Sequence, residues 1–330
     1  MHEAGPWALI HRGIADARRL AGWGRAPLQL AALALVGVFW GLYLARIWNQ
    51  LVSYSWRWSA IPVVGAVLIW GLYTLAQALG WLFLARTAGG QVTAPQGVRV
   101  WLLSMPARYI PGNVWHILSR VYLGNRVGLR PGPVLVASTV EQGMMIMGPL
   151  MVFLLSLVAW SDRVDSRFLF LALLIPVGLA CLHPRILQPL IMLASKVFHK
   201  PAPVLELRYR HLLAVAGWYT ALHFASGTAG YLVVVSLAPL PLSDLPMLAG
   251  AYSLAYVVGY LSLLTPTGLG VREAALLGLL STMVPAPVAA VAALLSRGLS
   301  SLGEGLCIVS AGALWRWRPH DRSTQPIATE

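Results

Sequence analysis

Residues 58–85 read WSAIPVVGAVLIWGLYTLAQALGWLFLA and contain no charged side chain between Arg57 and Arg86. About 20 mostly apolar residues are enough for a helix to cross the hydrocarbon layer of a bilayer, which is roughly 30 Å thick. This stretch therefore predicts a helix that spans a membrane, and the rest of the chain can be compared with it.

The whole chain has the same apolar character. Of its 330 residues, 58% are hydrophobic and only 11% are charged, and the mean hydropathy is +0.70. A soluble domain is about 45–50% apolar and about 25% charged, so the composition excludes a soluble globular protein. The 24 Lys and Arg residues outnumber the 11 Asp and Glu residues, which we attribute to basic loops that contact anionic lipid headgroups and not to nucleic-acid binding.

Further apolar stretches predict an all-α polytopic membrane protein. We expect about eight transmembrane helices, at residues 28–48, 60–85, 133–160, 167–182, 211–238, 246–264, 267–284 and 286–314. The predicted parts of the chain are a basic N-terminal segment (1–27), a single helical membrane domain (28–314) and a polar tail (315–330).

Basic segments indicate the orientation of the chain. They lie at the N-terminus, around Arg120, Arg126 and Arg130, within residues 183–210, and in the tail. Cytoplasmic loops carry the excess of Lys and Arg, so we expect these segments and both termini on the cytoplasmic side of a bacterial-type inner (plasma) membrane.

Two apolar segments are interrupted by proline and glycine. Residues 101–119 read WLLSMPARYIPGNVWHILS, and residues 262–280 read SLLTPTGLGVREAALLGLL. Backbone groups freed by such breaks must be buried in protein or line a water-filled cavity, because lipid offers them no partner. We therefore expect re-entrant or broken helices near residues 106–115 and 265–273, which in transporter-like folds point to a substrate site. Kinked helices without a transport role are the alternative.

Charged side chains within the apolar stretches need a physical reason, because each costs about 2.5–3.5 kcal/mol at mid-membrane. Three are acidic and three are basic: Glu141, Glu273 and Glu304, and Arg108, Arg272 and Arg297. One interpretation is a set of salt bridges that stabilise the bundle, and the other is a binding site. Arg297 and Glu304 are seven residues apart, about 10 Å along a helix, so each is expected to face a partner elsewhere.

The arginines suggest what a site would bind. Guanidinium groups stay charged and recognise phosphate in a bidentate geometry, and a helix that begins near Gly270 would add free N–H groups. The predicted substrate-binding residues are Arg108, Tyr109, Pro111, Gly112, Asn113, Trp115, Gly268, Gly270, Arg272 and Arg297. Glu141, Glu273 and Glu304 would be counter-charges or proton sites. Alternatively, the arginines reach to the headgroups of surrounding lipids.

Motifs of other chemistries are absent from the sequence. It contains no Walker-type phosphate loop, no His-Glu-x-x-His and no Gly-x-Ser-x-Gly. We therefore assign no catalytic residue, metal or cofactor, and we expect a transporter without an ATPase motif in preference to an enzyme.

Two motifs together resemble a known family. The segment PARYIPGNVW at 106–115, followed by TPTGLGVREAA at 265–275, is similar to the transmembrane region of lysylphosphatidylglycerol synthases, which also occurs alone in flippase-like membrane proteins. The resemblance extends over about residues 28–314. There are departures: Gln142 follows Glu141 where many relatives have arginine, and Ser296 precedes Arg297 where tyrosine is common.

The resemblance implies movement of a lipid headgroup between leaflets. Because the chain contains no segment like the aminoacyl-transferase domain of those synthases, we do not expect lipid aminoacylation. The expected substrate is a phospholipid or a polyprenyl-phosphate-linked sugar. A membrane-embedded glycosyl or phosphoryl transferase and an accessory subunit of a lipid-linked envelope pathway are the alternatives. Anionic membrane lipids are the expected partners, together with a second copy of the chain or a protein of envelope biosynthesis.

Overall fold

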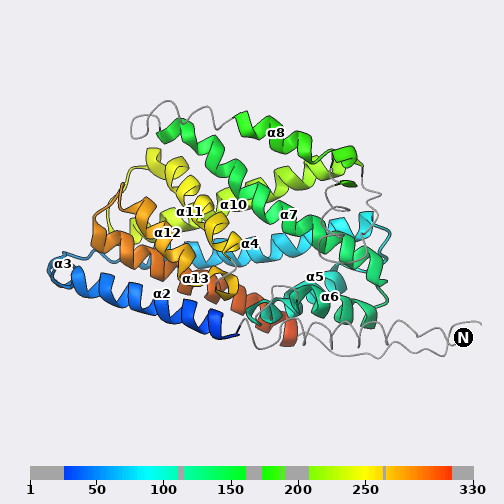
Figure 1. Ribbon diagram of the computed structural model, residues 1–330, viewed down its shortest axis with the longest axis horizontal. Coiled ribbons are helices and arrows are strands. Elements are labelled where there is room, and N and C mark those ends of the chain that lie inside the picture. Colours follow the sequence, from blue (N-terminus) through cyan, green and yellow to red (C-terminus); the bar gives the residue numbers. More distant parts are fainter. Residues whose placement is uncertain are drawn as a thin grey trace, which may run out of the picture.

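The computed structural model describes residues 26–110, 115–160, 173–186, 188–189, 208–262 and 265–313. Within these ranges every regular element is helical, which confirms the all-α prediction (Figure 1). The α-helices are α2 (Ala26–Arg46), α3 (Trp48–Ser53), α4 (Ala60–Thr87), α5 (Ala94–Ser104), α6 (Trp115–Arg126), α7 (Pro131–Ser156), α8 (Leu174–Cys181), α10 (Tyr209–Leu237), α11 (Leu245–Leu261), α12 (Val271–Leu280) and α13 (Ala286–Ala313). The 3₁₀ segments are η1 (Met105–Tyr109), η2 (Leu157–Trp160), η4 (Leu242–Asp244) and η5 (Pro266–Gly268).

Four helical segments in the described part of the chain are long and apolar enough to cross a bilayer. They are Ala60–Thr87, Pro131–Trp160, Tyr209–Leu237 and Ala286–Ala313. At 28 to 30 residues each, they measure about 42–45 Å and exceed the hydrocarbon thickness. The protein is therefore a helical membrane protein, but the count of eight spans is not confirmed.

The remaining predicted spans differ from the observed helices in length. The span at 28–48 corresponds to α2 and that at 246–264 to α11, which has 17 residues. The span at 267–284 contains only the ten-residue α12, because the chain turns sharply before Val271. The expected span at 167–182 is represented by α8, and its first residues lie outside the described part, as do residues 1–25 and the polar tail.

The outer surface of α4 shows why the chain needs lipid around it. Its buried face includes the polar side chains of Thr74 and Gln77. The exposed face is a stripe of large apolar side chains at helical spacing: Ile61, Val64, Leu68, Leu72, Leu75, Leu79 and Phe83. An apolar exposed face of this length is suited to hydrocarbon and not to water.

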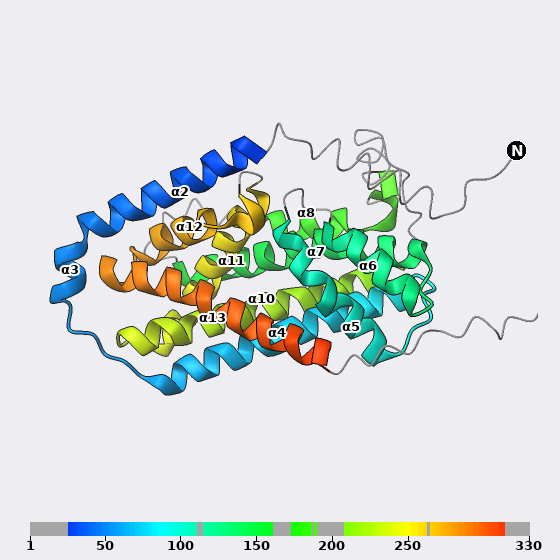
Figure 2. The same ribbon diagram turned by 90° about the horizontal axis from the view of Figure 1, so that it is seen from below.

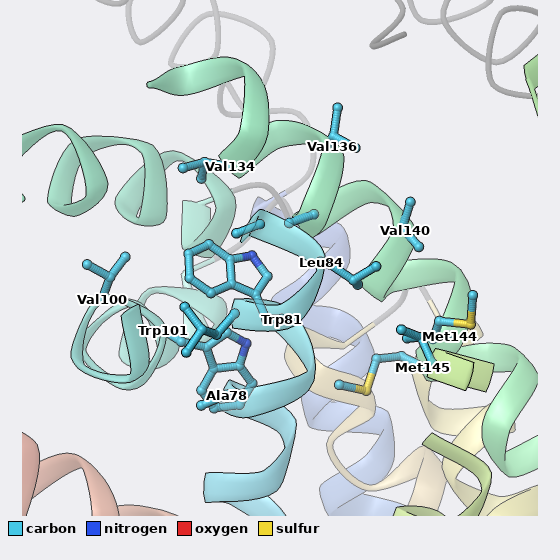
Figure 3. Close-up of a cluster of buried hydrophobic side chains, with 14 of the residues drawn as sticks. Ala78, Trp81, Leu84, Val100, Trp101, Val134, Val136, Val140, Met144 and Met145 are labelled. Atoms are coloured by element: carbon cyan, nitrogen blue, oxygen red, sulfur yellow. The ribbon is translucent and has the colours of Figure 1, made fainter. Parts of the chain in front are cut away.

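The interior contains two large apolar clusters. One gathers around Trp81, Trp101 and Tyr219, where α4, α5, α7 and α10 meet (Figure 3). The other gathers around Trp70 and Tyr252 and joins α4 and α10 to α11, α12 and α13. Helix α2 runs along the outside of this second cluster, beside α12 (Figure 2).

Each predicted break lies between two helices that pack against one another. Helices α5 and α6 have 11 and 12 residues, or about 16–18 Å each, and pack against one another on either side of η1. Helices α11 and α12 likewise pack together on either side of η5. The two 3₁₀ segments η1 and η5 are in contact, so segments about 160 residues apart in sequence meet in the fold.

Candidate functional site

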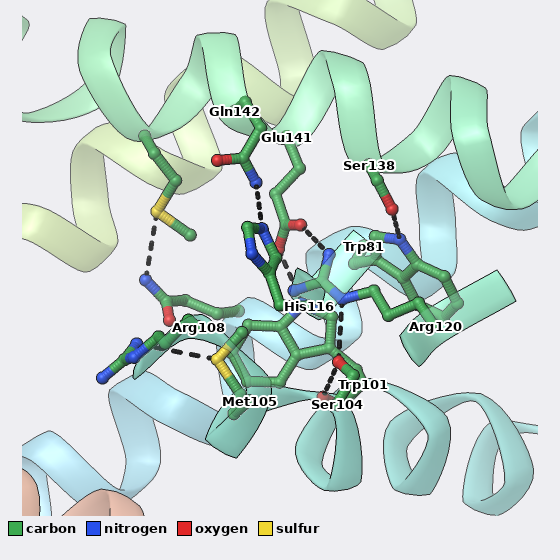
Figure 4. Close-up of polar contacts among 12 residues, drawn as sticks. Trp81, Trp101, Ser104, Met105, Arg108, His116, Arg120, Ser138, Glu141 and Gln142 are labelled. Atoms are coloured by element: carbon green, nitrogen blue, oxygen red, sulfur yellow. Dashed lines mark hydrogen bonds and ion pairs between the residues drawn. The ribbon is translucent and has the colours of Figure 1, made fainter. Parts of the chain in front are cut away.

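A fully buried ion pair joins α6 to α7. Arg120 and Glu141 are 1% and 0% exposed, and the guanidinium group of Arg120 donates to Glu141 (Figure 4). Glu141 Oε1 also accepts hydrogen bonds from Trp101 Nε1 at 2.7 Å and from the Tyr219 hydroxyl at 3.3 Å. Every oxygen of this carboxylate therefore has a partner, and the pair is enclosed by protein.

Arg120 is held by other groups as well. Its Nε donates to Ser104 Oγ at 3.0 Å, and its guanidinium carbon lies 5.6 and 5.1 Å from the ring centroids of Trp81 and Trp101. These contacts correct the sequence-based assignment of Arg120 to an exposed basic segment. The available signal was spacing: His116 and Arg120 are four residues apart, so they share one face of α6, and both are buried.

A second ion pair joins the first break to the last helix. Arg108 on η1 donates to Glu304 on α13, and these side chains are 30% and 13% exposed. Arg108 also contacts Tyr109, whose hydroxyl accepts a hydrogen bond at 3.3 Å. Within the described residues, the buried Nε of Arg108 has no hydrogen-bond partner. This pair is thus more open than that of Arg120.

A third acid–base pair lies at the second break. Arg297 Nε is 3.8 Å from Glu273 Oε1, and Arg297 Nη2 donates to Thr267 Oγ1 at 2.8 Å. As expected from their spacing, Arg297 and Glu304 do not pair with each other. Thr267 has a φ of 54°, which is a left-handed conformation that a β-branched residue rarely adopts.

The start of α12 differs from the sequence-based expectation. Gly268 and Gly270 have φ values of 67° and 83°, which let the chain turn directly into the helix. The backbone N–H of Gly270 donates to Glu273 Oε2 at 2.6 Å. The chain's own carboxylate therefore occupies one of the donors that we expected an external anion to use.

Arg272 has no carboxylate partner among the described residues. Its side chain is partly exposed, and its guanidinium carbon lies 5.7 Å from the ring centroid of Tyr256. Arg272 adjoins Glu273, which lies 3.8 Å from Arg297, and η1 with Arg108 contacts η5 just before α12. Arg272 is thus a cation that the structure holds near two others.

We call Arg108, Arg272, Arg297, Glu273 and Glu304 the arginine cluster. Arg108 comes from η1, Arg272 and Glu273 come from α12, and Arg297 and Glu304 come from α13. These side chains lie where the two breaks meet. Of the other predicted binding residues, Tyr109, Gly268 and Gly270 lie in or beside the breaks, and Trp115 begins α6. Pro111, Gly112 and Asn113 lie outside the described residues.

Tyrosines of α11 form a polar band next to the cluster that sequence reasoning did not identify. Tyr256 stacks on Tyr260 with ring centroids 5.8 Å apart, and the Tyr260 hydroxyl donates to Gln142. The ring centroid of His223 lies 5.0 Å from that of Tyr256. Nε2 of His223 forms a hydrogen bond of 3.2 Å with the Tyr73 hydroxyl. The usable signal was the four-residue spacing of tyrosines on α11, which places them on one face.

The described residues contain no group of three or more His, Cys, Asp and Glu side chains that could hold a metal ion.

Comparison with known proteins identifies one family. The family model described as the lysylphosphatidylglycerol synthase TM region matches residues 26–303, which is most of the 330-residue chain. The match includes both breaks and ends one residue before Glu304. No curated protein matches the chain.

Proposed function

Since the chain belongs to the family of the lysylphosphatidylglycerol synthase transmembrane region, we propose that it translocates lipids with phosphate-bearing headgroups between the leaflets of a membrane. The family supports a lipid-related function in the membrane. The further step to translocation rests on the side chains that the fold gathers at the two breaks.

The observation that carries the proposal is the arginine cluster. Three guanidinium groups gather with two carboxylates, and Arg108, Arg272 and Arg297 are all partly exposed. A guanidinium group suits a phosphate because its planar fork of donors matches two phosphate oxygens. A charged headgroup that enters the bilayer needs such a site to replace its hydration.

The broken backbone supports the same proposal. The buried hydroxyl of Thr265 has no hydrogen-bond partner among the described residues, and the peptides around Gly268 are not part of a regular helix. Irregular backbone at membrane depth is stable only in protein or beside a polar cavity. We propose that α5, η1 and α6 form a re-entrant hairpin opposite the η5 turn, and that the headgroup passes between them while its acyl or prenyl chains remain in lipid.

We propose the inner membrane as the location, with both termini cytoplasmic and anionic lipids as partners. The basic segments and the positive-inside rule support this orientation. Cysteines introduced at Arg57 and within the tail should react with an impermeant thiol reagent on opposite sides of the membrane. Labelling of both sites from one side would contradict the orientation.

Transfer in vesicles tests the translocase. Purified protein is reconstituted with fluorescent phosphatidylglycerol, and the rate at which the headgroup reaches the other leaflet is measured. We expect transfer with wild-type protein and at least about tenfold slower transfer with Arg272→Gln, because one phosphate contact to a charged donor is worth about 1.5–3 kcal/mol. Arg57→Gln removes the same charge from an exposed loop and should leave the rate unchanged.

The lipid recovered from the vesicles must have an unchanged mass. A changed headgroup would favour the membrane-embedded transferase. Failure to move phosphatidylglycerol, phosphatidylethanolamine and a polyprenyl-phosphate-linked sugar would contradict the proposal. Equal loss of transfer with Arg272→Gln and Arg57→Gln would remove its structural basis.

A further inference from the structure

The charges of the arginine cluster do not balance. Arg108 pairs with Glu304, and Arg297 lies 3.8 Å from Glu273. Arg272 faces the ring of Tyr256 and has no acidic partner in the part of the chain that the structure describes. The cluster therefore carries one positive charge more than its carboxylates neutralise.

Neighbouring groups do not remove this excess. Among the residues that the structure describes, the other buried ion pair close to the tyrosine band is Arg120 with Glu141, and these two charges neutralise each other. Tyr73 and Tyr256 line the same region with phenol groups that contribute dipoles and not a counter-charge, and the imidazole of His223 offers no negative charge. An excess charge in a medium of low polarity is unfavourable, and a bound anion of matching charge relieves it.

From this imbalance we infer that the site selects headgroups whose phosphate carries a single negative charge, as a phosphodiester does, over phosphomonoesters and pyrophosphates that carry two or more. The inference rests on the proposed function and adds the charge class of its substrate. Phospholipids with a diester headgroup and sugars linked through one phosphate belong to this class, whereas pyrophosphate-linked lipids do not.

The geometry indicates how one phosphate would be held. Arg272 is the cation that is free to receive it, and Arg108 has a buried Nε without a partner among the described residues. Glu304 accepts from Nη2 of Arg108, so it uses a different donor of the guanidinium group from the unpartnered Nε. A second negative charge on the ligand would face the carboxylates of Glu304 and Glu273, and their repulsion would disfavour it.

The test compares two lipids that differ in phosphate charge. Wild-type protein in vesicles is supplied with fluorescent phosphatidylglycerol or with a fluorescent polyprenyl pyrophosphate, and the two transfer rates are measured at pH 7. We expect the diester to move at least about tenfold faster. The repulsion between two like charges at close range in a protein is larger than the free energy that corresponds to a tenfold change in rate. Equal rates, or faster transfer of the pyrophosphate, would overturn the inference.

Glu304→Gln supplies the matched change. It removes one negative charge from the cluster while keeping the side-chain shape, so the ratio of the two rates should shift toward the pyrophosphate by about tenfold. Arg57→Gln, in an exposed loop, should leave the ratio as in wild type. An unaltered ratio with a folded Glu304→Gln protein would overturn the inference, and if that variant does not fold, the wild-type ratio decides.

The outcomes separate the two proposals. Transfer of the diester without selectivity, or with a ratio that ignores Glu304, would overturn the charge inference and leave the translocase standing. If phosphatidylglycerol does not move but phosphatidylethanolamine or the polyprenyl-phosphate-linked sugar does, that lipid takes its place as the diester in the comparison. Transfer of none of these lipids by the wild-type protein would overturn both proposals.

Discussion

Two groups of membrane-embedded charges in this protein differ in how completely they are enclosed. The pair Arg120–Glu141 is 1% and 0% exposed, and hydrogen bonds from indole and phenol groups complete the shell of its carboxylate. In the arginine cluster, Arg108 is 30% exposed and Arg272 has no carboxylate partner among the described residues. One group is closed and neutral, and the other is open and positive.

The difference teaches that an embedded ion is not by itself a sign of a binding site. The apolar sequence context of Glu141 fits both a proton site and a counter-charge. In the fold Glu141 is the counter-charge of Arg120, and its surroundings suit a structural role because a ligand would have to displace several partners at once. The arginine cluster has atoms left to bind something, and the following predictions test this contrast.

The largest effect is expected at the closed pair. Replacing Glu141 by Leu leaves the buried Arg120 without its counter-charge, which should lower the free energy of unfolding by about 3–5 kcal/mol. Denaturant or thermal unfolding in detergent micelles measures the change. The double variant Arg120→Met/Glu141→Leu should recover most of the loss, because no buried charge remains unpaired. Similar stability of the single variant and the wild type would contradict the structural role.

The second effect concerns the turn that shapes the open cluster. Gly270 has a φ of 83°, and an added Cβ would lie 1.9 Å from Val36 Cγ1 on α2. Gly270→Ala should therefore lower the free energy of unfolding by about 1–3 kcal/mol. Gly278→Ala on the same helix meets nothing within 4 Å, and it should instead stabilise by about 0.5–1 kcal/mol, since alanine favours helix. Equal effects of the two substitutions would refute the turn geometry.

Both groups of charges contain features that the sequence predicts and features that it does not. The breaks near 106–115 and 265–273 follow from proline and glycine in apolar surroundings, and the fold contains η1 and η5 there. Arg297 and Glu304 must have separate partners because seven residues separate them by about 10 Å along a helix. Both expectations depend on local properties of the chain, which a sequence carries directly.

The partners themselves could not be derived in this way. Arg108 and Glu304 are 196 residues apart, and their pairing depends on the crossing of η1 and α13. Arg120 lies on α6, a helix that is not apolar overall and therefore resembles a cytoplasmic loop in composition. The predicted count of eight spans is not confirmed for a related reason. Hydropathy does not show that the helix after Gly270 has only ten residues.

A smaller effect on stability is expected for the partly exposed pair. Glu304→Leu, the same change as at Glu141, leaves Arg108 30% exposed and in contact with Tyr109. Its cost should be about 1 kcal/mol or less, well below that of the corresponding change at Glu141. Unfolding measured under the same conditions as for Glu141→Leu gives the comparison directly. Equal costs at the two acids would show that the cluster is as closed as the Arg120 pair.

The smallest effect on stability is expected for Arg272→Gln. The substitution removes the contact of the guanidinium group with the Tyr256 ring, which is worth about 0.5–2 kcal/mol. It also removes one of the three like charges of the arginine cluster, whose two carboxylates pair with the other two arginines. These contributions oppose each other, so the free energy of unfolding should change by no more than about 0.5 kcal/mol. An arginine within an apolar region whose loss leaves stability intact but slows lipid transfer would be held there for its ligand. A loss as large as that of Glu141→Leu would instead assign Arg272 to the scaffold.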